Sequence, residues 1–276
     1  MANFEKFKEV ILCKDANATP VAEIVIDNEI KERFIDRKIE NLSDDIFFWR
    51  SAGYDFIPIS SGILQPAKTL GGHEGEKWAE EDIGQITNFE DLEKYPWPRA
   101  EELDYSIFDE ARFLIPDGMK VIGLNGKIFT ISWMLMGWMG FSYAIYDNPT
   151  LIRELFERVG EIQFKSFCKV ANMDSVGAMW VIDDIAYSES LLVSPNFLRN
   201  HLFPWLRKMV GYANEKGKPV IYHSDGMLYD VLDDIIGMGF NALHPVEPKS
   251  MDLSILKKKY GKKLCFIGRV DLDRFI

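Results

Sequence analysis

Short apolar runs alternate along the chain with longer segments in which apolar residues recur every three or four positions. This alternation predicts repeated β-α units, in which the strands form a parallel sheet and the helices cover it. The fold class predicted from this pattern is α/β, and a (β/α)₈ TIM barrel that lacks its last β-α unit fits best. The candidate strands are residues 20–26, 54–59, 120–124, 178–182, 219–222, 241–243 and 264–267.

The segments between these runs carry the end signals of helices. Asn148 and Pro149 mark the start of one helix, because Asn caps helices and Pro is favoured in their first turn. Ser194 opens a second helix, which Pro204 is expected to bend. A later helix is predicted over residues 253–260, where a glycine follows the last apolar position.

Residues 73–118 break the pattern with a polar stretch that is too long for an ordinary βα loop, so we expect a lid or insertion there. Neither a repeat nor a flexible linker divides the chain, which favours a single domain over residues 1–276. Because only seven strands are found, we expect the sequence to be a fragment that lacks the eighth strand and its closing helix.

The net charge and the cysteine content limit which partners and which cellular compartment we expect for the protein. The chain has 32 Lys and Arg against 43 Asp and Glu, and a net charge of -11 disfavours a nucleic-acid partner. Its 3 cysteines lie far apart, which argues against a disulfide framework. Charged residues interrupt the apolar positions at the N-terminus, so we expect no signal peptide and a cytoplasmic protein.

Residues 128–146 carry no charge, and this stretch is long enough for a membrane span. However, Trp133 and Trp138 lie near its middle, where a span usually has aliphatic residues, and its flanks show no basic bias. We therefore expect no membrane partner, and we interpret the stretch as a buried helix and loop that form core or the wall of an apolar pocket.

Ionisable side chains follow four consecutive candidate strands, at the end of the barrel where βα loops carry active sites. Each also has a simpler interpretation, as a helix cap for the aspartates, a solvated turn residue for Glu247 or a core histidine for His244. The residues are Asp183 and Asp184 after the fourth run, His223 and Asp225 after the fifth, His244 and Glu247 after the sixth, and Arg269 after the seventh.

Taken together, these groups suggest two kinds of chemistry. His223, Asp225 and Glu247 are candidate ligands for zinc, manganese or iron, because imidazole and carboxylates suit these ions. Without a metal, crowded carboxylates in an apolar mouth have raised pKa values and can exchange protons with a substrate. The motifs GxxxxGK[ST], GxSxG and HExxH are absent from the sequence, and no GxGxxG follows a strand.

Residues 181–208 and 217–271, with HSDG at 223–226 and NALHPVEP at 241–248, resemble the uroporphyrinogen decarboxylase superfamily. The closer resemblance is to its branch of cobamide-dependent methyltransferases, from about residue 121 onward and more loosely before it. The resemblance implies a (β/α)₈ barrel with a pocket at its C-terminal mouth.

The sequence departs from the decarboxylase proper at three places. The arginine-rich signature that binds a polycarboxylate has no counterpart in residues 21–34, the FSDIL segment becomes ISSGIL at 59–64, and the pocket tyrosine aligns near Met134. In the methyltransferase branch a His-x-Cys pair binds zinc. Here His223 is kept, but Asp225 replaces the soft thiolate with a hard carboxylate.

We therefore expect a methyltransferase that moves a methyl group between a small methylated substrate, or a tetrahydrofolate-like acceptor, and a separate corrinoid protein. Whether zinc is bound and whether the protein is a homodimer stay open. The alternatives are a carboxy-lyase that acts on a different acid, with Arg269 as anchor, and a non-catalytic ligand-binding barrel. The candidate catalytic residues are His223, Asp225, Glu247, Asp183 and Asp184, and the candidate substrate-binding residues are Asn125, Phe129, Trp133, Tyr187, His244 and Arg269.

Overall fold

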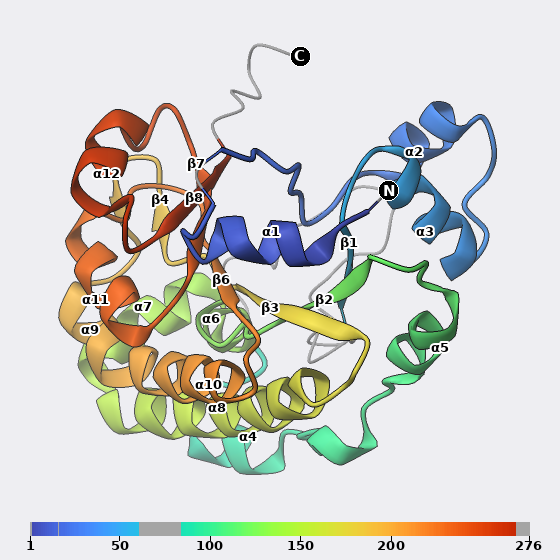
Figure 1. The fold of residues 1–276 in the computed structure, drawn as a ribbon. Coiled ribbons are helices and arrows are strands. Elements are labelled where there is room, and N and C mark those ends of the chain that lie inside the picture. Colours follow the sequence, from blue (N-terminus) through green and yellow to red (C-terminus); the bar gives the residue numbers. More distant parts are fainter. Residues whose placement is uncertain (1, 16, 61–83, 269–276) are drawn as a thin grey trace.

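Six strands of the computed structural model form one parallel sheet in the order β1-β2-β3-β6-β7-β8 (Figure 1). The structure describes residues 2–15, 17–60 and 84–268. Within these ranges β1 and β8 are the two edges of the sheet and do not pair with each other. The strands are β1 (Phe56–Ser60), β2 (Lys120–Asn125), β3 (Val176–Ile182), β6 (Val220–His223), β7 (Ala242–Val246) and β8 (Cys265–Gly268). This α/β architecture agrees with the predicted class and with a TIM-barrel-like fold.

One candidate strand is wrong. Residues 20–26 have no regular secondary structure, although the six other runs all fall on strands of the sheet. Among the described residues the segment pairs with no strand, and Pro20 has no N–H to donate to a ladder. Its apolar residues have another place in the structure, because the segment forms one wall of a cavity, while Val21 is 49% exposed and Val25 is 69% exposed.

The predicted helix ends are found where the sequence placed them. The Asn148 side chain accepts a hydrogen bond of 3.2 Å from the backbone N–H of Leu151 and caps α8. A break immediately before Pro204 separates α9 from α10. The helices on the sheet are α8 (Pro149–Ala171), α9 (Pro195–His201), α10 (Phe203–Glu215), α11 (Leu232–Met238, after the 3₁₀ turn η2, Tyr229–Val231) and α12 (Leu253–Tyr260).

The uncharged stretch 128–146 folds as two short helices, α6 (Phe129–Met136) and α7 (Trp138–Asp147). They are separated at Gly137, whose φ of 70° interrupts the helical backbone. Along α6, Ile131 and Leu135 are buried in the core. Among the described residues, no helix combines the length and the apolar character that crossing a bilayer requires.

Residues 84–118 of the polar stretch 73–118 are described, and residues 73–83 lie outside the described ranges. Residues 84–118 contribute to the helical layer, because the Tyr105 hydroxyl donates to the Ala100 carbonyl and lies 3.1 Å from the Ser166 hydroxyl of α8. Phe108 is buried beside them. The elements of this segment are α4 (Phe89–Lys94), the 3₁₀ turn η1 (Ala100–Glu102) and α5 (Ser106–Leu114).

The two faces of the sheet pack against different partners. On the inner face, Phe56 and Trp180 contact Phe7 and Ile11 of α1 (Phe4–Ile11), which Figure 1 shows lying across the sheet. On the outer face, residues such as Val181 pack under the helices. Each large apolar side chain buried in this way contributes about 1.5–3 kcal/mol. Apolar contacts therefore hold helix α1 inside the barrel, which is open between β1 and β8 in the described residues.

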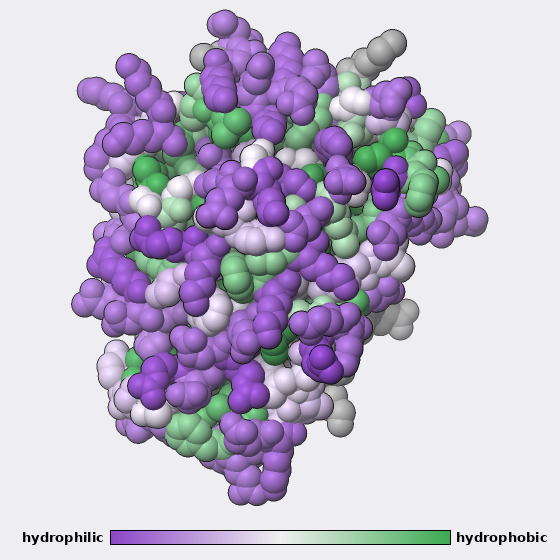
Figure 2. Space-filling model, turned by 60° about the horizontal axis from the view of Figure 1, so that its bottom comes forward, coloured by the Kyte–Doolittle hydropathy of each residue, from purple (hydrophilic) through white to green (hydrophobic). Residues whose placement is uncertain are grey.

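Two further helices, α2 (Asn28–Ile35) and α3 (Leu42–Ser51), precede β1, and a small hairpin of β4 (Ala186–Tyr187) and β5 (Ser190–Leu191) follows β3. Lys31 of α2 is buried in an ion pair of 2.7 Å with Asp45. The face of the molecule in Figure 2 is dominated by hydrophilic side chains, with apolar residues in small separate groups.

Candidate functional site

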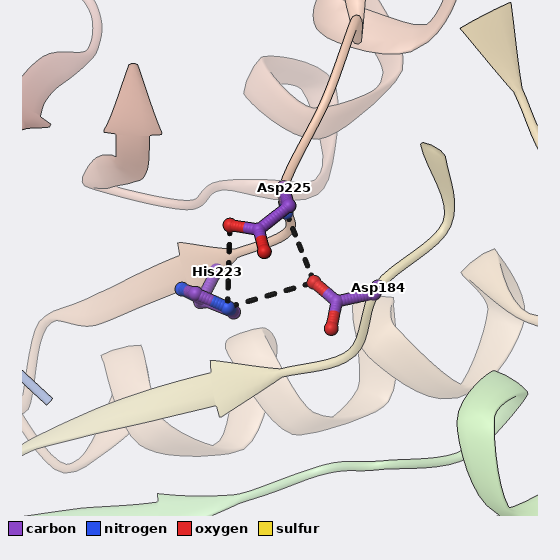
Figure 3. A group of neighbouring side chains, drawn as sticks. All are labelled: Asp184, His223 and Asp225. Carbon is purple, nitrogen blue, oxygen red and sulfur yellow. Dashed lines mark hydrogen bonds and ion pairs between the residues drawn. The ribbon is translucent and has the colours of Figure 1, made fainter. Parts of the chain in front are cut away.

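Three ionisable side chains meet where β3 and β6 end, and Figure 3 shows them facing one another. His223 Nε2 lies 3.5 Å from Asp184 Oδ1 and 3.9 Å from Asp225 Oδ1. The Asp225 backbone N–H donates to Asp184 Oδ1 at 2.9 Å. Parallel pairing of Ile182 with His223 brings these loop residues together, because both strands end at the same edge of the sheet.

The donor set of this cluster suits a divalent cation. One ligand atom from each of Asp184, His223 and Asp225 lies within 4.8 Å of the others. One imidazole nitrogen and two carboxylates are typical ligands of zinc, manganese or iron, and they are harder than a set that contains thiolates. The His223 side chain is 12% exposed while both aspartates are half exposed, so the histidine is fixed and the carboxylates face solvent.

The electrostatics of the cluster bring the protonation of one of its carboxyl groups toward neutral pH. Burial, followed by repulsion from Asp184 and Glu247, raises the pKa of the Asp225 carboxyl to about 6. Burial lowers the pKa of His223, and the Asp184 carboxylate acts in the opposite direction. A carboxyl group that titrates close to neutral pH is able both to donate and to accept a proton.

Glu247 positions the loop that carries Asp225. Its Oε2 accepts hydrogen bonds from the Gly226 backbone N–H at 2.8 Å and from the Ser250 hydroxyl at 3.1 Å. Gly226 has a φ of 85°, and a Cβ there would collide with the backbone of Tyr187, so only glycine fits this turn. Glu247 therefore lies next to the cluster and holds its loop, and it is not one of the three convergent groups.

Ser224 fixes the same loop from inside. The side chain is fully buried, accepts the Ile185 backbone N–H at 3.0 Å and lies 3.0 Å from the Asp225 carbonyl. Sequence reasoning did not single out Ser224 between His223 and Asp225. A short polar residue between two candidate ligands is the signal that points to it, because such a position must turn inward when its neighbours face the site.

Asp183, expected as a catalytic group, does not join the cluster. Its carboxylate accepts backbone N–H groups of Ile128 at 3.0 Å, Phe129 at 2.7 Å and Thr130 at 2.8 Å. Burial raises the pKa of Asp183 to about 7, and the N–H groups of Thr130 and Phe129 oppose that shift. The residue thus caps α6 across the barrel, where an oxygen acceptor satisfies the free amides of a helix start.

His244 lies beside His223 and lines the same edge of the sheet. The two Nδ1 atoms are 2.8 Å apart and the rings are stacked with centroids 5.1 Å apart. Trp180 contacts the other side of His244 edge-on. Burial, and then the neighbouring His223, lowers the pKa of His244 to about 3, so this imidazole is neutral at physiological pH.

The other expected pocket residues are placed elsewhere or fall outside the description. Phe129 is fully buried among core aromatics, and Trp133 packs edge-on against Trp138. Asn125 is buried, and its amide donates to the Ser166 hydroxyl of α8. Tyr187 is exposed on the hairpin. Arg269 lies outside the described residues.

A cavity of about 840 Å³ adjoins the cluster. Residues 18–25 form one wall, and the ends of β6, β7 and β8 form the other, with His223, Asp225 and His244 in the lining. Glu23 belongs to the first wall, and its Oε1 lies 3.9 Å from His244 Nε2. Sequence reasoning missed Glu23 because residues 20–26 were interpreted as a strand. An acidic residue within an otherwise apolar run was the available signal.

The chain belongs to the uroporphyrinogen decarboxylase family, since residues 45–275 match the family described as uroporphyrinogen decarboxylase (URO-D). Among solved structures, a methyltransferase from Methanosarcina mazei is similar, with a TM-score of 0.73 and 14% sequence identity over 96% of this chain and 82% of that chain. At this identity the likeness shows the shared fold. No curated protein matches the chain significantly. The family match confirms the resemblance inferred from the sequence and supports an enzymatic function.

Proposed function

We propose that the protein transfers a methyl group between a small methylated substrate, or a tetrahydrofolate-like acceptor, and the cobalt of a separate corrinoid protein. The observation that carries the proposal is the cluster of Asp184, His223 and Asp225 at the C-terminal mouth, directly beside a cavity of about 840 Å³. The fold shared with a methyltransferase supports the reaction class.

The cavity favours this reaction over uroporphyrinogen decarboxylation. Its described lining contains the acidic residues Asp15, Glu23, Asp225 and Glu247 and no arginine. A polycarboxylate in this space would face four carboxyl groups, and like charges within a few ångströms repel. A neutral methyl ether or amine, by contrast, has apolar surface for the aliphatic walls and one heteroatom for the acidic cluster.

The chemistry assigned to these residues concerns the heteroatom that releases the methyl group. In the demethylation direction the carbon–heteroatom bond breaks, the electron pair of cobalt(I) forms the cobalt–carbon bond, and the heteroatom takes up a proton. Asp225, with a pKa of about 6, supplies that proton at the heteroatom. A divalent ion held by Asp184, His223 and Asp225 would instead supply Lewis acidity at the same atom, because a metal-bound Asp225 carries no proton to donate.

The decisive experiment mixes the protein with free cob(I)alamin and a series of methyl ethers and methylamines, and follows the conversion to methyl-cobalt(III) by ultraviolet–visible spectroscopy. Asp225→Asn should lower the rate by about 10²- to 10⁴-fold, because it removes the proton donor. Asp109→Asn, on the exposed surface of α5, is the matched control and should leave the rate unchanged. Spectra that stay unchanged with every donor, or equal rates for the two variants, would contradict the proposal.

Two cations in the lining favour a second candidate, a carboxy-lyase that acts on a small acid. Lys249 and Lys257 both line the cavity, and the ammonium group of Lys257 would anchor a carboxylate there. Release of carbon dioxide from a panel of aromatic and aliphatic acids, without any corrinoid present, would identify this activity. It would be abolished by Lys257→Met, whereas methyl transfer should tolerate that change.

A further inference from the structure

The cluster is connected to the cavity wall by two neighbouring imidazoles. His223 and His244 occupy paired positions on β6 and β7, and their Nδ1 atoms share a hydrogen bond of 2.8 Å. Beyond this pair, His223 Nε2 faces Asp184 and Asp225, while His244 Nε2 faces Glu23. The N-terminal segment, β7 and β6 thus contribute to one series of contacts, which runs from Glu23 through His244 and His223 to the cluster.

A hydrogen bond between two Nδ1 atoms of neutral imidazoles allows two arrangements. Each neutral ring carries one N–H, so the ring that donates through Nδ1 has a bare Nε2, and the ring that accepts through Nδ1 carries its proton on Nε2. Either His223 has the bare Nε2 toward Asp184 and Asp225, or His244 has the bare Nε2 toward Glu23.

The surroundings of the two ends differ enough to select one arrangement. A bare His244 Nε2 would face the Glu23 carboxylate, 3.9 Å away, as two acceptors without a proton, where the His244 side chain is 7% exposed and the Glu23 side chain is 39% exposed. At the other end, the Asp184 and Asp225 side chains are 50% and 56% exposed, so water or a cation can separate them from a bare nitrogen. A bare imidazole nitrogen that faces carboxylates is therefore less costly at His223 than at His244.

We propose that Glu23 and His244 are positioning residues that keep the proton of His223 on Nδ1 and direct the bare Nε2 of His223 into the cluster. The Glu23 carboxylate attracts the His244 Nε2–H across 3.9 Å, His244 Nδ1 accepts from His223 Nδ1–H, and the His223 Nε2 lone pair is left for a divalent ion or a substrate proton. The Ile24 backbone N–H donates to the same Glu23 oxygen at 2.8 Å and fixes the carboxylate in this direction.

This inference deepens the proposed function, on which the use of the His223 lone pair rests, but its test needs neither a corrinoid nor a methyl donor. The chain has 4 histidines, so ¹⁵N-histidine labelling gives a simple long-range ¹H–¹⁵N spectrum, in which His223→Asn and His244→Asn assign the two rings. In metal-free protein we expect the proton of His223 on Nδ1 and that of His244 on Nε2. The reverse assignment would overturn the proposal.

A second measurement tests Glu23 through the affinity of the cluster for Zn²⁺, with a chelating dye as competitor. Glu23→Gln should weaken Zn²⁺ binding by about 10- to 100-fold, the range typical of groups that orient a ligating histidine. Asp15→Asn, which changes another acidic residue of the same cavity, is the matched control and should bind Zn²⁺ like the wild type. Equal affinities for Glu23→Gln and wild type would overturn the role of Glu23.

The two measurements separate failure of this inference from failure of the proposed function. If methyl transfer is absent but the histidine tautomers are as expected, the positioning chain stands and the reaction assigned to it is wrong. If the tautomers are reversed while methyl transfer occurs, the reaction stands and the positioning chain is wrong.

Discussion

Replacing Asp183 by alanine should destabilise the protein much more than replacing its neighbour Asp184. The Asp183 carboxylate accepts three backbone N–H groups at the start of α6, at 2.7–3.0 Å, and it is 1% exposed. Alanine removes all three acceptors at once. The amides of Ile128 and Phe129 lie in a fully buried region, where no solvent can take the place of the carboxylate.

The expected magnitude follows from the number of donors left unpaired. Each buried N–H without an acceptor costs about 1–3 kcal/mol, and loss of the buried charge offsets part of the sum. We therefore expect Asp183→Ala to lower the free energy of unfolding by about 3–5 kcal/mol, which corresponds to a fall in Tm on the order of 10 °C. Asp184 accepts one backbone N–H and is half exposed, so Asp184→Ala should cost about 1 kcal/mol or less.

Urea unfolding followed by circular dichroism, with a chelator present, measures both variants under the same conditions. The variant that loses more stability should be the one that keeps its affinity for Zn²⁺. Asp184→Ala should lose affinity for Zn²⁺, while Asp183→Ala, assayed well below its Tm, should keep it. If the two variants unfold within 1 kcal/mol of each other, the helix-cap role of Asp183 is refuted.

Two other predictions concern pH and packing. His244 has a pKa lowered to about 3 by burial, against 6.5 in the unfolded chain, so its contribution to stability is complete above pH 6.5 and is lost as the pH falls toward 3. Between pH 7.5 and 5 the wild type should therefore lose about 2 kcal/mol more than His244→Asn, and parallel pH profiles of unfolding would contradict this. A Cβ at Gly160 of α8 would overlap the ring of Trp205, whereas Gly211 of α10 has open space. Gly160→Ala should lower the free energy of unfolding by about 1–3 kcal/mol and Gly211→Ala should raise it by about 0.5–1 kcal/mol, and a stabilised Gly160→Ala would show that α10 moves aside.

Local sequence chemistry was sufficient for much of the fold. Asn148 and Pro149 start α8 for local reasons. The Asn148 side chain accepts a backbone N–H that the first turn leaves free, and Pro149 has no N–H that would need a partner there. Pro204 separates α9 from α10 for a similarly local reason. The strand interpretation of residues 20–26 failed because a short apolar run indicates contact with an apolar surface, and here that surface is the wall of a cavity and not a neighbouring strand.

The candidate site was predicted in part. Strand order brought His223, Asp225 and Asp184 to one edge, because residues after parallel strands share that edge. Sequence could not tell Asp183 from Asp184, since adjacent residues at the end of a strand face opposite sides and only the position of α6 decides which one is buried. Glu23 could not be found at all, because its contact with His244 depends on how a segment without regular structure crosses the barrel.

The family match begins at residue 45, yet α1 and the wall of the cavity lie before it. A shortened chain that started at residue 45 would expose the inner faces of the six strands to solvent. The aromatic and aliphatic side chains on these faces would then favour self-association. It would also lack the carboxylate that faces His244. The unit that homology recognises is thus smaller than the unit that folds, and protein engineering of this barrel has to preserve the larger one.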